Sequence, residues 1–414
     1  MSVSSNFSNH LVSEFKRTCS NFIQCKKFLF EVEQKNEITL IFIYLYMCKL
    51  TDEIDIKNKY SKKANSIYLK YFNHKDGMLN EFDWAELELY KYNLSEIFNY
   101  DVYYLKDNVV INTGRCLFKE YDVLFYRYKI ECQIGKGTYS NVYKCYDFKR
   151  KQHIALKAIR NDTKFINSGD KEINVLQKLK HKSICNYIKY FKIEKHHFIV
   201  FELQEGNIYQ YVKSTRFEPM KPKLVNQIAK QLIPVLVYIK SVNVIHADIK
   251  PENILVKHID DENITVKLSD FGSAMKKHKN CVGYIVSRYY RAPEIVLEKY
   301  GGCDYLIDMW SFSTIVYELL MGKPLFPAKT EKKLIYSIFK ELGYPHESFL
   351  SDCRKRNFLE SQVEDTFCDS FQENIIKVKC IDTNAYEFLC ASLIWEKEKR
   401  LTCDDAMNHK YLLN

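Results

Sequence analysis

The chain has 414 residues, of which 46% are hydrophobic and 28% charged, and this composition excludes a disordered or collagen-like protein. Its formal net charge of +10 comes from short lysine-rich patches spread along the chain. We expect these patches to be solvated faces and expect no direct nucleic-acid binding. Attraction to acidic substrates or nucleic acid is the alternative.

The 14 cysteines form no C-x-x-C pair, and none stands at zinc-finger spacing from a histidine. We therefore expect free thiols in a reducing compartment and no metal held by cysteine. The longest apolar run, Leu40–Cys48, has 9 residues, whereas a membrane-spanning helix needs about 20. No membrane partner and no signal peptide are expected.

Residues 1–127 are predicted to be an N-terminal extension of unknown role, followed by a folded domain over residues 128–413. The extension carries no motif to which chemistry can be attached. Apolar residues recur at helical spacing between Trp84 and Phe98, which predicts partial folding against the following domain rather than a loose tail.

From about Tyr128 the apolar residues alternate with the two-residue period of β-strands, through residues 142–145 and 153–159. This pattern predicts an antiparallel sheet. From Leu224 to Ile239 apolar residues recur every three or four positions, which predicts a long helix that Pro234 should kink. We therefore predict an α+β fold, with a small β-rich lobe followed by a larger helical lobe.

The first two predicted strands are joined by the segment IGKGTYSNV, which runs from Ile134 to Val142. Gly135 and Gly137 allow the backbone to approach phosphate groups closely, and Val142 would cover a nucleotide base. Two glycines in a turn are by themselves a weak signal for nucleotide binding.

The next predicted strand contains IALK, whose Lys157 is the candidate to hold the α- and β-phosphates of a nucleotide. Glu172, in the following segment KEINVL, is placed where it could form an ion pair with this lysine. For a lysine and a glutamate alone, the alternative is a surface salt bridge worth about 0–1 kcal/mol. The motifs that follow decide between the two.

The segment HADIKPEN, from His246 to Asn253, brings together a base, a cation and a metal ligand. Asp248 can accept the proton of a substrate hydroxyl, and Lys250 can neutralise a phosphoryl group during its transfer. Asn253 offers a hard oxygen to Mg²⁺, and Asp270, which opens DFG at the end of the predicted strand VKLS, is the second metal ligand. We therefore predict ATP and Mg²⁺ as cofactors.

Taken in this order, the motifs resemble those of the eukaryotic protein kinases, and the resemblance covers about residues 103–413. It implies a bilobal fold and transfer of the γ-phosphoryl group of ATP to Ser or Thr hydroxyls of protein substrates. Two positions depart from the commonest family pattern. Ser140 stands where a third glycine is usual, and Ala247 replaces the arginine of H-R-D.

The resemblance also implies an adenine site in the stretch FIVFELQE. Phe201 would guard a back pocket, and the backbones of Glu202 and Gln204 would hydrogen-bond the base. Leu255 would lie beneath the purine, although an ordinary core strand is the alternative for this stretch. The predicted ATP-binding set is Ile134, Gly135, Gly137, Ser140, Val142, Ala155, Lys157, Phe201, Glu202, Gln204 and Leu255.

Two supporting contacts follow from the same resemblance. Glu294 of the APE motif is expected to form a buried pair with Arg400 in EKEKRLT, which would anchor the segment before it. Asp308 in LIDMWS is expected to hold the backbone of the loop that starts at His246.

The segment SRYYRAPEI, residues 287–295, resembles the CMGC group of Ser/Thr kinases. HADIKP with its alanine, DFGSA and a Y-x-V-S-R-x-YRAPEI segment are similar to the pre-mRNA processing factor four kinases, near the dual-specificity tyrosine-regulated kinases. This similarity implies splicing factors as substrates and a nuclear location. The alternative location is the cytoplasm. The sequence DKEINVL shows no cyclin-docking pattern.

Ala247 removes the arginine with which other kinases hold a phosphate on this segment, and Tyr284 precedes Arg288 and Arg291. We therefore predict that Tyr284 is autophosphorylated and that both arginines contact its phosphate. The alternative is an unmodified tyrosine that packs beside them. For the whole chain, the alternatives are another CMGC branch, or a pseudokinase scaffold motivated by Ser140 and Ala247.

Overall fold

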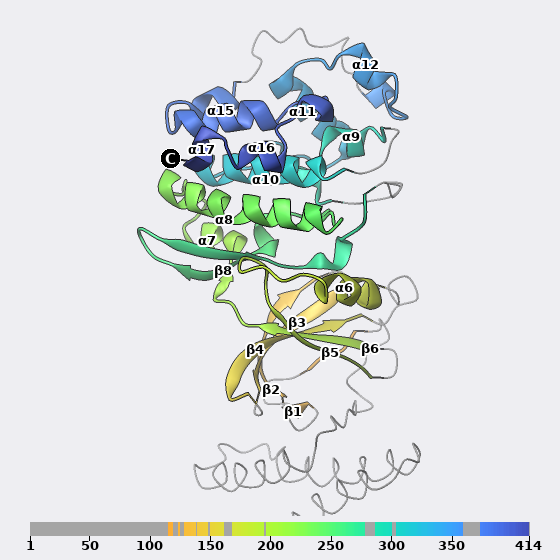
Figure 1. Cartoon of the computed structure of the whole chain (residues 1–414), viewed down its shortest axis with the longest axis vertical. Coiled ribbons are helices and arrows are strands. Elements are labelled where there is room, and N and C mark those ends of the chain that lie inside the picture. Colours follow the sequence, from red (N-terminus) through yellow and green to blue (C-terminus); the bar gives the residue numbers. More distant parts are fainter. Residues whose placement is uncertain are drawn as a thin grey trace, which may run out of the picture. The chain divides into compact units, whose positions relative to one another are not determined.

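The computed structural model describes residues 115–118, 123–124, 128–137, 139–147, 150–160, 168–193, 196–277, 286–299, 304–358 and 373–413, which Figure 1 draws in colour. The apolar run Leu40–Cys48, the predicted helical segment Trp84–Phe98 and Tyr284 lie outside these residues. Within the described part of the chain, no helix combines the length and the apolar character that crossing a bilayer requires.

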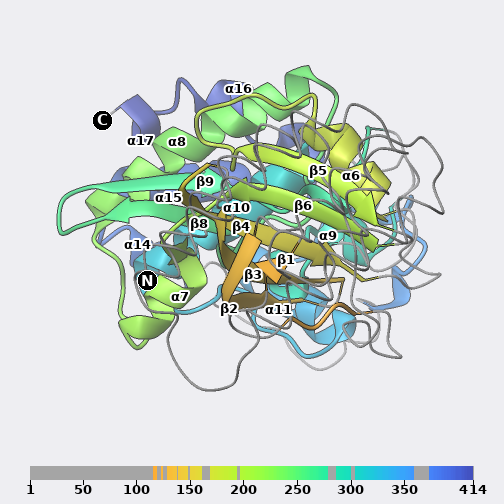
Figure 2. The same ribbon diagram turned by 90° about the horizontal axis from the view of Figure 1, so that it is seen from below.

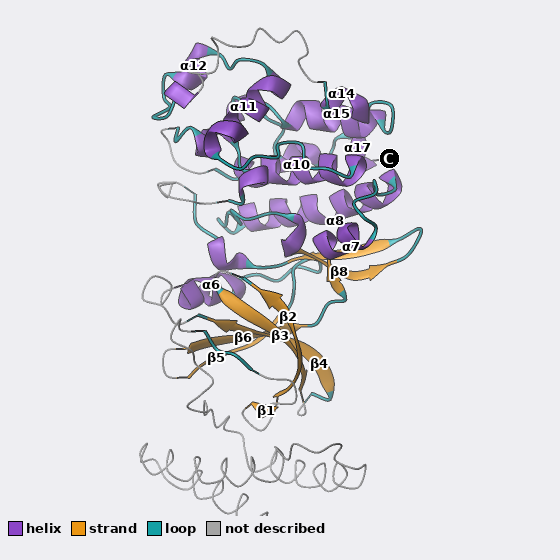
Figure 3. Cartoon of the chain, turned by 180° about the vertical axis from the view of Figure 1, so that it is seen from behind, coloured by secondary structure: helices purple, strands orange, loops and turns teal. Residues whose placement is uncertain are grey.

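The chain divides into two compact units. Unit 1 comprises Met1–Asp162 and Phe191–Phe198, and unit 2 comprises Thr163–Tyr190 and Ile199–Asn414. The described residues of unit 1 lie mainly in strands and those of unit 2 mainly in helices, as the colours of Figure 3 show. The predicted α+β class is therefore confirmed.

The strands of the first sheet follow the order β1-β2-β3-β4-β6-β5. β1, β2, β3 and β4 pair antiparallel in chain order, which confirms the predicted sheet. β6 and β5 complete it and lie side by side in Figure 2. The bounds are β1 Val123–Leu124, β2 Tyr128–Lys136, β3 Ser140–Asp147, β4 Gln152–Ile159, β5 Tyr187–Ile193 and β6 His196–Glu202.

The core of unit 1 follows from the two-residue period of its strands. On β3, Tyr143 and Cys145 are buried, while Lys144 between them is partly exposed. Aromatic rings fill the space beneath the sheet, where Phe191 stacks on both Tyr128 and Phe198 with ring centroids 6.1 and 5.2 Å apart. Such ring pairs stabilise a small core beyond the area that they bury.

Unit 2 contains the remaining elements, several of which are single helical turns. The α-helices are α6 Ser168–Leu176, α7 Ile208–Ser214, α8 Pro222–Ser241, α9 Pro293–Val296, α10 Leu306–Met321, α11 Glu331–Leu342, α12 Glu347–Leu350, α14 Ile375–Val378, α15 Thr383–Ser392, α16 Cys403–Ala406 and α17 Lys410–Leu413. The 3-10 helices are η1 Pro251–Asn253, η2 Phe271–Ser273, η3 Arg288–Tyr290 and η4 Lys397–Lys399. A second sheet, in the order β7-β8-β9, comprises Gly206–Asn207, Ile254–Ile259 and Ile264–Leu268.

Helix α10 is the centre of unit 2. Every residue from Ile307 to Leu320 is buried, as expected of a helix that is apolar around most of its circumference. It packs against α8 on one side and α15 on the other (Figure 1). Its Trp310 ring stacks on Phe326 at 5.8 Å. The helix ends at Gly322, which adopts the left-handed conformation that favours glycine at this position.

Helix α8 confirms the helix predicted after Pro222. Pro222 occupies its first turn, where the missing N–H costs no hydrogen bond, and one face of the helix is buried. The helix continues through Pro234 to Ser241, and the predicted kink at Pro234 stays a prediction. The loop that follows α8 contains the residues of the predicted catalytic segment.

Candidate active site

The loop from His246 to Asn253 is held in place by hydrogen bonds to Asp308 of α10. The carboxylate of Asp308 accepts hydrogen bonds from the backbone N–H groups of His246 at 2.7 Å and Ala247 at 2.9 Å. Burial raises the pKa of Asp308, and these two bonds oppose the shift because they favour the ionised form. The predicted supporting role of Asp308 is confirmed.

Three residues around this loop adopt a left-handed backbone conformation that side chains other than glycine rarely adopt. Their φ angles are 60° at Ala247, 62° at Asp270 and 63° at Val286. Each such residue costs roughly 1–2 kcal/mol. Strained residues of this kind cluster at functional sites, where the surrounding structure imposes them.

His246 orients the backbone of Asp248. Its Nδ1 accepts the N–H of Asp248 at 3.2 Å, and its Nε2 lies 2.9 Å from the carbonyl oxygen of Ser269. With Nδ1 as the acceptor, Nε2 is the nitrogen that donates to the Ser269 carbonyl. The ring also packs edge-on against Phe271 at 4.8 Å. His246 is thus a positioning group rather than a proton carrier.

The carboxylate of Asp248 lies among hydrogen-bond donors. Its Oδ2 accepts from Lys250 Nζ at 2.6 Å, and its Oδ1 accepts from the hydroxyl of Ser287 at 2.8 Å. Burial alone would lower the pKa of Lys250, but the carboxylates of Asp248, Glu252 and Asp270 outweigh it and raise that pKa. Lys250 therefore carries a positive charge beside Asp248.

The two predicted metal ligands lie on either side of the β8–β9 hairpin and are linked through Ser269. The carbonyl oxygen of Asn253 accepts from both the N–H and the hydroxyl of Ser269, at 2.9 and 3.0 Å, and Asp270 is the next residue. The Asn253 amide nitrogen donates to the carbonyl of Asp248 at 2.8 Å. The amide oxygen therefore remains to bind a metal.

Asn253 and Asp270 together offer one amide and one carboxylate oxygen. Hard divalent ions such as Mg²⁺ are held in this way, by one or two protein oxygens together with the phosphates of a substrate and water. Among the described residues, no three or more His, Cys, Asp or Glu side chains gather into a metal site. The donor set thus fits a metal that arrives with a phosphate rather than one enclosed by protein alone.

Glu172 is buried on α6, beside the backbone of Gly272. A Cβ added at Gly272 would lie 3.4 Å from Glu172 Oε2 and 3.2 Å from Asp270 Oδ1. A side chain here would make an ordinary contact with Glu172 and a tight one with Asp270, whose carboxylate would have to shift by a few tenths of an ångström. The predicted ion pair between Glu172 and Lys157 involves residues of separately described units, so it stays a prediction.

In unit 1, three of the predicted ATP-binding residues form one row across the sheet. Gly135 pairs with Val142, and Val142 pairs with Lys157. Directly opposed residues of neighbouring strands share a face of the sheet, so these three lie on the same face. A Cβ at Gly135 would lie 3.3 Å from Val142 Cβ, a tight contact to which one of the two strands would have to adjust by a few tenths of an ångström.

The turn that follows Gly135 is closed by a hydrogen bond from the N–H of Gly137 to the carbonyl of Ser140, at 2.9 Å. A Cβ at Gly137 would meet only the Ser140 oxygen at 3.6 Å, an ordinary contact. Packing within the described chain therefore does not require glycine at position 137. Ser140 and Ala155 are buried, while Ile134 is exposed.

The predicted adenine-binding stretch lies at the end of β6. Phe201 is buried, and the N–H of Glu202 donates to the carbonyl of Asn186 at 3.1 Å. Glu202 can therefore offer a ligand its carbonyl oxygen but not its N–H. Leu255, on β8, is partly exposed between buried neighbours. Gln204 follows β6 in the connection to β7.

Arg400 and Glu294 form the expected buried pair. The guanidinium makes two parallel hydrogen bonds to the carboxylate, at 2.8 and 3.0 Å. The guanidinium carbon also lies 4.9 Å from the centre of the Trp310 ring. Two parallel hydrogen bonds between opposite charges set both the distance and the orientation of the two groups. They therefore fix α9 to the segment that contains Arg400. The predicted anchoring contact is confirmed.

Arg291, predicted to contact a phosphate on Tyr284, is 1% exposed. Its guanidinium donates to the carbonyl of Val286 at 2.8 and 3.2 Å, and it pairs with Glu331 at 2.7 Å. Arg288 lies in η3, partly exposed. The role predicted for Tyr284 stays a prediction, and Arg291 would have to leave these contacts to take part in it.

Two residues of the site were missed by sequence reasoning. Ser287 contacts Asp248 across a separation of 39 residues, which no local spacing indicates. Glu318 of α10 accepts a hydrogen bond from Tyr290 at 2.9 Å, and both are buried. Glu318 stands inside the apolar sequence of α10, and a charged residue in that setting is a signal from which its contact with Tyr290 could have been expected.

Comparison with known proteins adds a family match and a set of relatives. The sequence model described as "Protein kinase domain" matches residues 128–412. The dual specificity tyrosine-phosphorylation-regulated kinase 4 of Homo sapiens is 32% identical over 309 residues, which are 70% of this chain and 58% of that protein. The probable serine/threonine-protein kinase dyrk2 of Dictyostelium discoideum is 33% identical over 315 residues, 71% of this chain and 34% of that protein.

A third relative, the dual specificity tyrosine-phosphorylation-regulated kinase 2 of Drosophila melanogaster, is 30% identical over 318 residues, 73% of this chain and 43% of that protein. This chain therefore covers between 34% and 58% of these three relatives. Their names agree with the predicted resemblance to the CMGC group. The finer similarity to the pre-mRNA processing factor four kinases stays a prediction.

Proposed function

The chain belongs to the protein kinase domain family, and from this premise we propose that it transfers the γ-phosphoryl group of ATP to Ser or Thr hydroxyls of proteins. The observation that supports this most directly is the hydroxyl of Ser287, 2.8 Å from Asp248 Oδ1. An aliphatic hydroxyl therefore fits against this carboxylate within hydrogen-bonding reach. A substrate hydroxyl that takes the same place would have its proton next to the base.

Four residues of unit 2 have a role in this proposal. Asp248 accepts the proton of the attacking hydroxyl, and Lys250, 2.6 Å from Asp248, stabilises the negative charge of the phosphoryl group in transfer. Asn253 and Asp270 hold the metal through their side-chain oxygens. Mg²⁺, when bound, neutralises charge on the phosphates.

The predicted ATP-binding residues that lie in unit 1 are proposed to contact the nucleotide. Lys157 would meet the α- and β-phosphates, and the row that it forms with Val142 and Gly135 supports this role. The room beside Gly137 is also consistent with it, because glycine there is not required by the packing of the described chain. A close approach of phosphate to the backbone is a reason for glycine that packing does not supply.

We further propose, from the sequence resemblance, that the substrates are splicing factors and that the protein acts in the nucleus. The relatives' printed names include dual specificity and regulation by tyrosine phosphorylation, which supports autophosphorylation of Tyr284. The test is mass spectrometry of active protein together with the Tyr284→Phe variant. An unmodified tyrosine and full activity of the variant would exclude this regulation.

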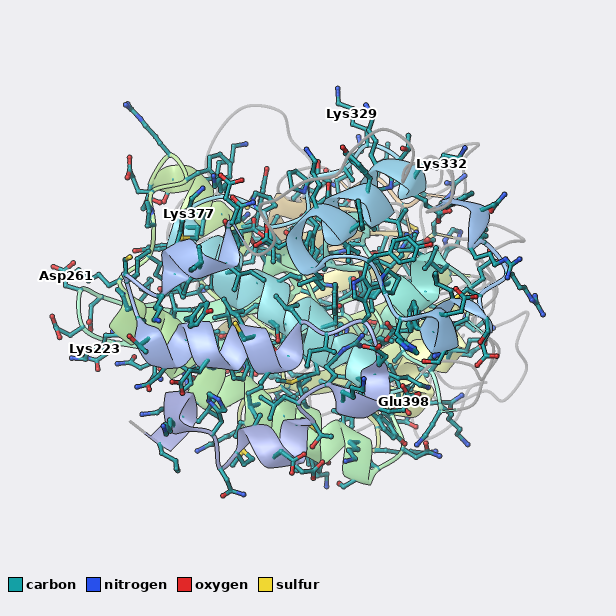
Figure 4. All side chains as sticks on the ribbon, turned by 90° about the horizontal axis from the view of Figure 1, so that it is seen from above. Lys223, Asp261, Lys329, Lys332, Lys377 and Glu398 are labelled. Carbon is teal, nitrogen blue, oxygen red and sulfur yellow. The ribbon has the colours of Figure 1, made fainter. Side chains whose placement is uncertain are left out.

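Transfer of labelled γ-phosphate from Mg·ATP to generic and Arg/Ser-rich protein substrates tests the proposed reaction. We expect transfer by the full chain, loss of transfer in Lys157→Arg, and label on Ser or Thr. Lys223→Arg is the matched control, because Lys223 is an exposed lysine of α8, labelled in Figure 4. Binding of Mg·ATP without transfer would contradict the proposed reaction and favour a pseudokinase scaffold.

Peptide preference then tests the branch. Dependence on arginine around the phosphorylated residue would support splicing-factor substrates. A strict requirement for proline after that residue would contradict them and favour a proline-directed CMGC kinase.

A further inference from the structure

Residues 115–118 precede the part of the chain that the kinase family match covers, and they lie against the glycine-rich turn of unit 1. We call these four residues the strap. Arg115 reaches both sides of the turn. Its Nη2 donates to the carbonyl of Gly137 at 2.9 Å, and its Nη1 donates to the side-chain oxygen of Asn141 at 3.1 Å.

The strap itself is fixed by buried polar contacts with β3. The carbonyl of Cys116 accepts from the side-chain amide of Asn141 at 3.1 Å and from the hydroxyl of Tyr143 at 3.0 Å. The N–H of Phe118 donates to the same hydroxyl at 3.4 Å. Because Asn141 and Tyr143 are both buried, these bonds are shielded from water and hold the strap in one register.

Apolar contacts add to this attachment. Phe118 packs edge-on against Tyr143, with ring centroids 5.1 Å apart, and lies 6.2 Å from Phe198. Cys116 is buried with its sulfur 3.3 Å from Nδ1 of His196. Leu117, between them, is 43% exposed. The alternation is that of an extended segment with one face on the protein.

The turn needs such support because it is exposed and rich in glycine. Gly137 is exposed and so is Tyr139. Glycine loses more conformational freedom on ordering than any other residue, so a ligand that binds a mobile glycine turn must offset that loss. A turn that is already held in place binds its ligand more tightly.

We propose that Arg115 is a positioning residue that holds the carbonyl of Gly137, and that it thereby preorganises the glycine-rich turn for the phosphates of a nucleotide. This inference rests on the proposed function for the identity of the ligand. It also extends the functional unit beyond the region of the family match, because the strap lies before residue 128. Binding by the remainder alone would be weaker.

The test compares the full chain with Arg115→Ala, Arg115→Lys and the matched control Leu117→Ala. Arg115→Ala is expected to weaken Mg·ADP binding and raise KM for ATP by about five- to tenfold, with kcat within about twofold, as for a lost charge-assisted hydrogen bond. Arg115→Lys should recover part of the loss, because lysine can reach one acceptor but lacks the fork. Leu117→Ala should match the unmodified chain.

A second readout does not depend on the ligand. Hydrogen exchange of the backbone from Gly135 to Asn141, measured without nucleotide, should be faster in Arg115→Ala and unchanged in Leu117→Ala. Unchanged exchange and unchanged Mg·ADP affinity in Arg115→Ala would overturn the inference. So would a fall in melting temperature and kcat with unchanged Mg·ADP affinity, since this indicates a purely structural role. If the unmodified chain neither binds Mg·ADP nor transfers phosphate, the proposed function fails, and unchanged exchange would then refute the strap separately.

Discussion

The catalytic loop of unit 2 and the glycine-rich turn of unit 1 are held by contacts of different kinds. The loop is fixed by buried groups. Asp308 and His246 are both buried, and each accepts a hydrogen bond from a backbone N–H of the loop. The turn is exposed, and the contact from Arg115 to Gly137 lies in solvent. A buried polar contact is costly to break, whereas an exposed one is readily exchanged for water.

This difference suggests a division of tasks between the two segments. The residues proposed to carry the chemistry stay fixed, because misplacing reacting groups by even 1 Å slows a reaction severely. The residues proposed to hold the nucleotide are tied by weaker bonds, which allows the ligand to enter and leave.

Asp308→Ala should lower the free energy of unfolding of unit 2 by about 4 kcal/mol, because two buried N–H groups lose their acceptor at about 1–3 kcal/mol each. Those groups belong to His246 and Ala247. Denaturant unfolding followed by circular dichroism measures the loss. A change below about 1 kcal/mol would mean that the loop does not depend on buried support.

Stability should also depend on pH through Glu318. Burial raises its pKa from 4.5 to about 7, and the hydrogen bond from Tyr290 only partly opposes this. The folded state therefore binds more protons than the unfolded state between these values, so stability decreases as pH rises from about 4.5 to 7, by about 3 kcal/mol in total. Unfolding measured across this range should show the decrease in the unmodified chain.

Glu318→Gln is the control for this dependence, because the amide has the same shape and does not titrate. The difference in stability between the two chains should change across pH 4.5–7 and stay constant above it. A difference that does not vary with pH would contradict the raised pKa. Other buried carboxyls, such as Asp308, are present in both chains and cancel in the comparison.

Gly137→Ala separates the needs of the fold from those of the ligand. The added Cβ meets only an ordinary contact, and Gly137 does not have a positive φ, so stability should stay within about 1 kcal/mol. Mg·ADP affinity should fall, because a methyl group keeps phosphate away from the backbone. Thermal unfolding and calorimetric titration check the two parts. Unchanged affinity would remove the proposed reason for glycine here.

The smallest effect is expected at the surface of unit 2. Lys223 pairs with Glu262 at 2.5 Å, but both side chains are more than 60% exposed. Lys223→Ala should change the free energy of unfolding by no more than about 0.5 kcal/mol. A larger loss in urea unfolding would mean that exposed contacts stabilise this protein as strongly as buried ones.

Much of this account could be predicted from the sequence, because the chemistry of the catalytic loop is carried by local motifs. The spacing from His246 to Asn253 and the DFG that begins at Asp270 need no knowledge of the fold. The pair of Glu294 and Arg400 spans 106 residues, yet the family resemblance supplied it. The periodicity between Leu224 and Ile239 correctly predicted helix α8.

Other contacts could not be predicted, because they depend on how distant segments meet. Ser287 contacts Asp248 because the fold brings together two segments that are 39 residues apart in the sequence. The guanidinium of Arg291 was predicted to contact phosphate, but its burial against Val286 and Glu331 depends on the packing of α11. The contact of Arg115 with Gly137 has no local signal, because the two residues belong to segments of unrelated pattern.

Asp248 is proposed to act as the base of the phosphoryl transfer, and the rate of transfer by Asp248→Asn measures this role. Asp261→Asn is the matched control, since Asp261 is 96% exposed and labelled in Figure 4. We expect Asp248→Asn to slow transfer by a factor of about 10²–10⁴ while Mg·ADP affinity and melting temperature stay unchanged, and we expect Asp261→Asn to match the unmodified chain. Transfer by Asp248→Asn at the unmodified rate would contradict the account.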